Sequence, residues 1–170
     1  SLVGSEMCIR DRGMTCSLPV LEYAKELHTN EDKTYRALAL SNLIAIHQKT
    51  GIGRLSAYCG AVSAGAAAGA GIAYLCGGGY EEVIHTVVNA LAIVSGMVCD
   101  GAKASCAAKI AASVDAGILG YNMYLQGQQF YAGDGIITKG IEGTIDNVGR
   151  LGKDGMKETN EEIIRIMIND

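Results

Sequence analysis

The sequence predicts an all-α domain in which two central, buried helices rich in glycine and alanine surround a candidate cluster site. Three observations predict the helical class. Apolar residues recur at helical spacing through most of the 170-residue chain. Residues 55–80 contain no charged side chain, which is typical of a buried segment. No segment alternates apolar and polar residues in the way that indicates a strand.

The first twelve residues, SLVGSEMCIRDR, match nothing that follows them. A back-translation of LVGSEMCIRDR resembles a common sequencing-library adapter. We therefore expect residues 1–12 to be an assembly artefact in which Cys8 has no function. On this interpretation the gene was truncated at its 5′ end, and residues 13–170 form the C-terminal part of a longer protein.

Two helices are predicted before the uncharged stretch. Residues 17–19 (Ser-Leu-Pro) are expected to open the first, with proline in its first turn, and it runs to about His28. Asn30 is the expected cap of a second helix over residues 31–50. Acidic residues lie in its first turn, and Gly51 is expected to end it.

Residues 55–80 predict a central buried helix. Small residues at Gly65 and Gly69 allow a neighbouring helix to approach closely. The same pattern occurs in membrane-spanning helices, but alanine and glycine provide too little transfer free energy, so we expect no membrane span. Residues 77–79, three glycines, end this helix. The apolar residues of 81–98 predict a second buried helix.

Three further helices complete the prediction. The first runs from about 104 to 125, and a weaker amphipathic helix covers 134–151. Thr159 and Glu162 have the spacing of a capping box for a last short helix, NEEIIRIMI. With neither an internal repeat nor a linker, the chain is expected to form one domain.

The charge and the cysteine count exclude some classes of protein. A net charge of -4 without a basic run argues against a nucleic-acid partner. Six cysteines permit a disulfide set, but a chain this long and apolar does not need one. With no evident cleavable secretory signal, we expect a reduced, cytoplasmic protein.

Cys59, Cys99 and Cys106 are the candidate metal ligands. Cys59 lies 40 positions before Cys99, and Cys106 lies seven positions after it. The first two fall at predicted element ends, while Cys106 begins a helix, where free N–H groups and the helix dipole favour a thiolate. Cys16 and Cys76 are interpreted as small apolar residues. The spacing matches neither a ferredoxin nor a zinc ribbon, so it leaves a cluster, a structural zinc site and incidental cysteines open.

Other polar residues lie near these cysteines or on the apolar helices. Each of them could have either an ordinary solvated, capping or core role or a functional one. These residues are Lys103, Lys109, Asp100, Asp115, Ser105, His28, His47 and His85.

Two long stretches, GIGRLSAYCGAVSAGAAAGAGIAYLCGG (51–78) and VSGMVCDGAKASCAAKIAASVDAG (94–117), resemble the C-terminal region of the L-cysteine desulfidase and serine dehydratase alpha-chain-like family. RALALSNL (36–43) and DNVGRLGKDGM (146–156) fit the same family, so the resemblance covers about residues 13–170. In that family, three cysteines at these positions hold a [4Fe-4S] cluster. The resemblance therefore assigns the cluster to Cys59, Cys99 and Cys106, and no role to Cys76.

The resemblance implies a lyase that eliminates the β-substituent of a small amino acid. L-Cysteine would yield pyruvate, ammonia and sulfide; L-serine remains an equal alternative. Three protein thiolates leave one iron open as a Lewis acid. The base is expected in the missing N-terminal region, the chain's expected partner. No catalytic or substrate-binding residue is assigned here, and the fragment alone is expected to be inactive.

The sequence is also compatible with an oligomer and with a different function. The close-packing glycine surfaces are compatible with a homo-oligomer. The alternative function is a non-catalytic packing or membrane module of small-residue helices with incidental cysteines.

Overall fold

The computed structural model describes residues 2–53 and 56–169, with side chains from residue 12 to residue 168. This part of the chain contains no strand, only an isolated antiparallel bridge between Tyr58 and Val98. The all-α prediction is confirmed. The elements are α1 (Leu2–Glu26), α2 (Glu31–Ile52), α3 (Gly60–Leu75), α4 (Tyr80–Val94), α5 (Ser105–Leu125), α6 (Ile141–Arg150), the π-helical turn η1 (Leu151–Gly155) and α7 (Lys157–Asn169).

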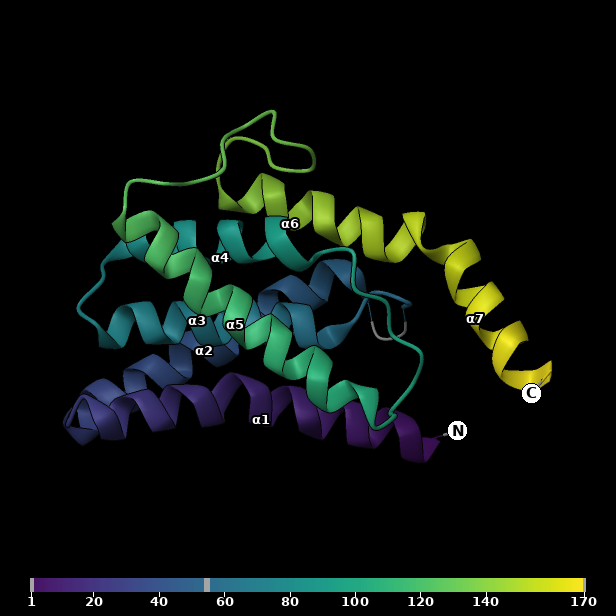
Figure 1. Ribbon diagram of the computed structural model, residues 1–170, viewed down its shortest axis with the longest axis horizontal. Helices are drawn as coiled ribbons and strands as arrows, with labels where there is room; N and C mark the ends of the chain where they lie inside the picture. The colour runs from purple at the N-terminus through teal and green to yellow at the C-terminus, as the bar shows by residue number, and fades with distance from the viewer. Residues whose placement is uncertain (1, 54–55, 170) are drawn as a thin grey trace.

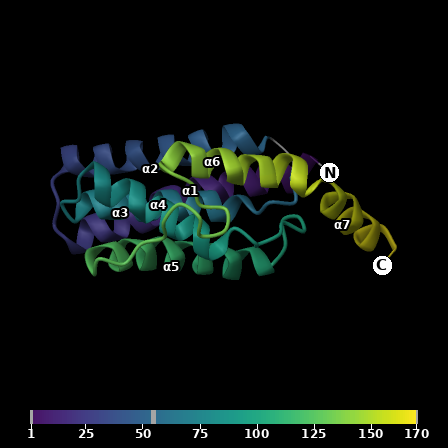
Figure 2. The same cartoon turned by 90° about the horizontal axis from the view of Figure 1, so that it is seen from above.

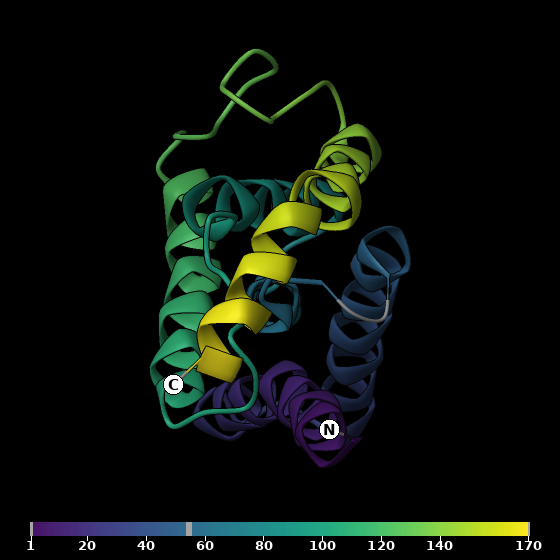
Figure 3. The ribbon, with the colours of Figure 1, turned by 90° about the vertical axis from the view of Figure 1, so that its right-hand side faces the viewer.

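Helix α3 lies at the centre of the molecule. It packs against α1, α2, α4 and α5, which surround it in the end view (Figure 1, Figure 3). All of its residues except Tyr74 are buried, as the uncharged sequence predicts. Within the described ranges, no helix combines the length and the apolar character needed to cross a membrane.

Glycines set the distance between α3 and α5. A Cβ added to Gly65 would lie 2.3 Å from the carbonyl carbon of Ser113, and one added to Gly69 would lie 2.7 Å from the backbone of Gly117. Neither position tolerates a side chain without separating the two helices. The small-residue spacing therefore serves backbone contact inside the domain.

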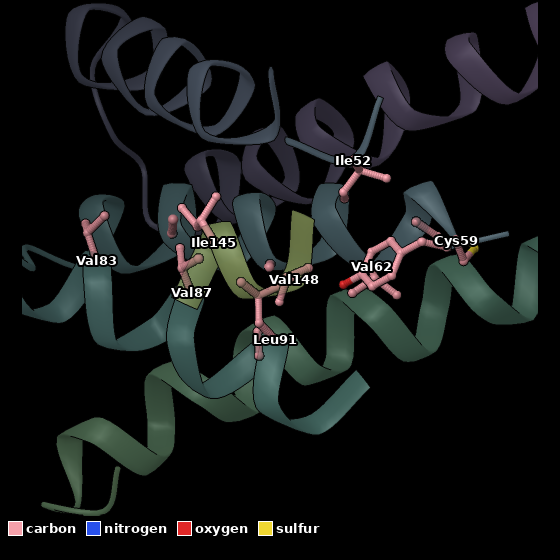
Figure 4. Close-up of a cluster of buried hydrophobic side chains, with 13 residues drawn as sticks. Ile52, Cys59, Val62, Val83, Val87, Leu91, Ile145 and Val148 are labelled. Atoms are coloured by element: carbon pink, nitrogen blue, oxygen red, sulfur yellow. The ribbon is translucent and has the colours of Figure 1, made fainter. Parts of the chain in front are cut away.

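Helix α4 is the second central helix, and it is amphipathic. Val83, Val87 and Leu91 point into the main core cluster (Figure 4), while Ile93 remains 39% exposed. The prediction placed its end at residue 98, but the helix ends at Val94. The following residues turn away because they pair with the segment before α3.

The start of the first helix differs from the prediction. Pro19 lies inside α1 instead of in its first turn, since α1 begins at Leu2. Proline removes one backbone donor from the helix. In this turn the Ser41 hydroxyl donates to the neighbouring carbonyl of Cys16 at 2.8 Å, and Val20 is fully buried. Packing on α2 and α3 thus supports a helix that local sequence rules would start later. The side chain of Cys8 lies outside the described residues.

The second helix is confirmed. The Asn30 side chain accepts a hydrogen bond from the Lys33 N–H at 2.9 Å, as a cap does, and α2 runs to Ile52. The cap residue after it is Gly53, two positions beyond the predicted stop.

The two C-terminal helices are displaced from their predicted starts. Helix α6 begins at Ile141 and not at 134, because glycines with positive φ, among them Gly135 and Gly140, interrupt the preceding segment. The prediction of a capping box formed by Thr159 and Glu162 is wrong. Helix α7 begins at Lys157, directly after η1, so Thr159 already lies inside it.

Candidate metal centre

Backbone pairing brings Cys59 and Cys99 together. The Cys59 N–H donates to the carbonyl of Met97 at 3.1 Å, and the Cys99 N–H donates to the carbonyl of Ala57 at 2.6 Å. Cys59 is also the N-cap residue of α3. Two segments 40 positions apart in sequence are therefore held side by side at the start of the central helix.

Cys106 enters the same region from α5, of which it is the second residue. Its Sγ donates to the carbonyl of Gly101 at 3.3 Å and accepts from the Lys103 backbone N–H at 3.4 Å. The loop between Cys99 and Cys106 thus folds back on the first turn of α5.

All three cysteines line one pocket, which has a volume of about 370 Å³ when the open solvent at its mouth is included. Cys59 marks where this pocket meets the core, because it stands at one end of the main core cluster (Figure 4). The complete lining is Arg12, Thr15, Cys59, Ala61, Cys99, Ala102, Cys106, Lys109 and Ile110.

The electrostatics of the pocket are dominated by burial of Cys59. Burial raises the pKa of the Cys59 thiol, and the neighbouring Cys99 and Cys106 raise it further. The backbone N–H of Ala61 and the ammonium of Lys109 act in the opposite direction. The three thiols and Lys109 therefore interact electrostatically as one group.

Lys109 is held at the pocket by Asp100. Its Nζ lies 2.5 Å from Asp100 Oδ1, and the lysine side chain is 19% exposed. The hydrogen bond from Lys109 lowers the pKa of Asp100, and the same bond raises the pKa of Lys109. Of the two lysines predicted near the cysteines, Lys109 lines the pocket, whereas Lys103 is exposed and offers its backbone N–H.

The cysteines that the sequence set aside lie elsewhere. Cys16 is buried against Ala64 and Ala67, and burial raises its pKa to about 11. Cys76 is exposed at the C-terminal end of α3. Neither lines the pocket.

The remaining polar candidates do not join the site. Ser105 and Asp115 are exposed and lie outside the pocket lining. His47 Nε2 is paired with Glu142 at the surface. His85 stacks on Tyr124 with ring centroids 4.9 Å apart, and its Nε2 lies 3.6 Å from Glu81 Oε2. Its buried Nδ1 has no hydrogen-bond partner in the described part of the chain.

Two pocket residues, Arg12 and Thr15, were missed by the sequence analysis. Both belong to α1, which packs against α3. No motif links them to cysteines more than 40 positions away, so only the helix packing identifies them. The non-native origin of residues 1–12, which include Arg12, stays a prediction.

Cysteine thiolates can bind either a zinc ion or an iron–sulfur cluster. Among the described residues, no three His, Cys, Asp or Glu side chains lie close enough together to hold one metal ion. A zinc ion needs sulfurs at about 2.3 Å from a common centre. Cys59, Cys99 and Cys106 line one pocket, and thiols are the donors that a four-iron cluster accepts, so the donor chemistry is compatible with a cluster.

Fold and site together define a helical domain with a thiol-lined pocket at the start of its central helix. Its sequence matches the description of one family, "Serine dehydratase alpha chain", over residues 11–165. The chain therefore belongs to the serine dehydratase alpha chain family, as the resemblance in its two cysteine segments predicts.

Curated relatives extend the comparison. The chain is 70% identical over 159 residues to a UPF0597 protein of Desulfitobacterium hafniense. The matched stretch covers 94% of this chain and 37% of that protein. UPF0597 proteins of Lachnoclostridium phytofermentans and Treponema denticola are 58% and 51% identical, again over 94% of this chain and 38% and 37% of their own lengths. The chain thus spans less than two fifths of these relatives. No solved structure matches it.

Proposed function

We propose that this chain is part of an iron–sulfur lyase that removes the β-substituent of L-cysteine or L-serine and deaminates the product. Pyruvate and ammonia are the common products, with sulfide released from cysteine and water from serine. The observation that supports this proposal is the convergence of Cys59, Cys99 and Cys106 on one pocket in a member of the serine dehydratase alpha chain family.

In this proposal the three thiols hold a [4Fe-4S] cluster as thiolates. When bound, the cluster supplies a Lewis acid at the iron that no protein thiolate occupies. Burial raises the pKa of the Cys59 thiol, which favours its protonated form, so binding as a thiolate would release that proton.

Lys109 has a supporting role in the same proposal. Its ammonium, held by Asp100 at 2.5 Å, places a positive charge beside the thiolates and reduces their mutual repulsion. Asp100 also keeps the lysine from turning to solvent. The pair thereby anchors the loop that begins at Cys99 to helix α5.

The proton at the substrate's α-carbon needs a base, and we assign none to this chain. The proposal places the base in the part of the longer protein that is outside these residues, which is the chain's proposed partner. A reduced, cytoplasmic setting belongs to the same proposal, because exposed thiolate–iron chemistry requires one.

Anaerobic reconstitution with iron and sulfide tests the cluster. We expect about four irons and four sulfides per chain, with the visible absorption of thiolate–iron charge transfer. Cys59→Ala, Cys99→Ala and Cys106→Ala should each lose most of that iron. Cys76→Ala and Cys16→Ala are the matched controls, and they should retain it.

Each other outcome has a defined meaning. Stoichiometric zinc without iron would make the pocket a structural zinc site, and equal iron in all five variants would make the binding adventitious. Pyruvate release by the reconstituted chain, compared with the full-length D. hafniense relative, tests the location of the base. Equal turnover by the two proteins would contradict the proposal that the base lies outside this chain.

A further inference from the structure

Helix α7 exposes several large apolar side chains to water, which is energetically unfavourable. Ile164, Met167 and Ile168 follow the i, i+3, i+4 spacing of one face, and their exposed fractions are 47%, 46% and 75%. We name these three residues the α7 face. Burying such side chains against another apolar surface is favourable.

The rest of the molecule gives α7 little support. Among the described elements it packs only against η1, and it projects beyond the ends of the other helices (Figure 1, Figure 2). Helices shorter than about 12–15 residues are marginal in water, and α7 has 13. A further packing contact would stabilise the helix and would remove its apolar face from water.

A second exposed stripe provides a comparison. Tyr35, Leu43 and Ile46 on α2 are each more than 60% exposed. Helix α2, however, packs against α1, α3 and α6, so its own stability does not depend on covering that stripe. Among the helices described, only α7 combines exposed apolar side chains with the short turn η1 as its single packing neighbour.

We infer that the α7 face is the docking surface for the part of the longer protein that lies outside this chain. The curated relatives contain this chain as 37–38% of their length, so roughly three fifths of each relative lies outside the matched stretch. A segment of the same polypeptide has a high effective concentration, about millimolar for a short flexible connection, which favours it as the occupant.

The position of the α7 face links this contact to the pocket. The nearest atom to a Cβ built on Gly101 is Met167 Cε, at 3.7 Å, and the Gly101 carbonyl accepts from Cys106 Sγ. A segment that covers α7 therefore lies beside the loop that connects Cys99 and Cys106. If the proposed function holds, this contact brings the missing base towards the pocket, but the docking itself does not depend on that function.

Hydrogen–deuterium exchange of this chain and of the full-length D. hafniense relative tests the inference. In this chain, the amides of α7 should exchange rapidly. In the full-length relative, the aligned amides should exchange about 100-fold more slowly, because docking buries two or more large side chains. The exposed stripe of α2 serves as the internal reference.

Matched variants of the relative locate the contact. Aspartate at the positions aligned with Ile164 and Ile168 should restore rapid exchange in α7 and leave the other helices protected. Aspartate at the position aligned with Ile46, which is 63% exposed on α2, should leave the α7 amides slow.

Three results would overturn the inference. The α7 amides could exchange equally fast in both proteins. They could already be slow in this chain and become slower as its concentration rises, which would identify a second copy as the occupant. Aspartate at the position aligned with Ile46, and not at those aligned with Ile164 and Ile168, could be what restores rapid exchange of the α7 amides. The experiment uses neither iron nor substrate, so its failure is separate from failure of the proposed lyase function.

Discussion

Replacing Gly65 by alanine should destabilise the domain through one backbone contact. The added Cβ would lie 2.3 Å from the carbonyl carbon of Ser113 and 2.4 Å from its oxygen. Ordinary van der Waals contact begins near 3.4 Å. Helices α3 and α5 must therefore separate by about 1 Å, since backbone atoms cannot rotate away as a flexible side chain does.

Two opposing effects set the size of the change. Alanine gains about 1 kcal/mol over glycine in helix propensity. Overpacking costs about 1–3 kcal/mol or more, and contact with a backbone lies at the upper end or above it. We expect a net loss of about 2 kcal/mol in the free energy of unfolding. With a slope of about 2 kcal/mol per molar urea, the midpoint falls by about 1 M.

Gly13→Ala is the matched control. Gly13 also lies in a helix, α1, but a Cβ at this position meets nothing within 4 Å. This variant should gain up to about 1 kcal/mol from helix propensity alone. Both are measured by urea unfolding followed by helical circular dichroism. If the midpoint of Gly65→Ala equals or exceeds that of Gly13→Ala, the close-packing argument is refuted.

Two further predictions concern titratable groups. Burial raises the pKa of Cys16 from 9.0 to about 11, so the unfolded chain loses this proton first, and stability should fall by roughly 2–3 kcal/mol between pH 9 and pH 11. Urea midpoints across that range should show a flatter slope for Cys16→Ala; an unchanged slope would contradict the assignment. Lys109→Met should weaken iron retention against a chelator by about 10-fold or more, whereas Lys109→Arg should largely preserve it. Equal loss in both variants would indicate a packing role for the lysine.

The sequence predicts the central helices well because their signal is local. An uncharged run of small residues has to be buried, and a side-chain cap such as Asn30 acts within one turn. Where predictions fail, the cause is either a distant contact or a local backbone geometry that the residue pattern does not show. Pro19 looks like a helix start, yet α1 continues through it because α2 and α3 pack along it. Thr159 looks like a cap, but the preceding π-helical turn leads directly into α7.

The candidate site divides in the same way. Cys99 and Cys106 are close in sequence, so their proximity is predictable from one short loop. Cys59 requires a tertiary contact, the pairing of residues 57–59 with 97–99, which spacing alone does not reveal. The family resemblance supplied that link. Thr15 had no such support, because its place in the pocket depends only on how α1 crosses α3.

The glycine content and the cysteine pocket are consequences of one packing arrangement. Gly65 lies six residues after Cys59 on α3, and Ser113, which it contacts, lies seven residues after Cys106 on α5. Two rigid helices therefore fix the separation of these thiols from a contact about two turns away. Metal–ligand distances in a working site hold to about 0.2 Å. A separation of about 1 Å at Gly65 exceeds that tolerance, so under the proposed function a residue with no chemistry of its own determines whether the thiols can share a cluster.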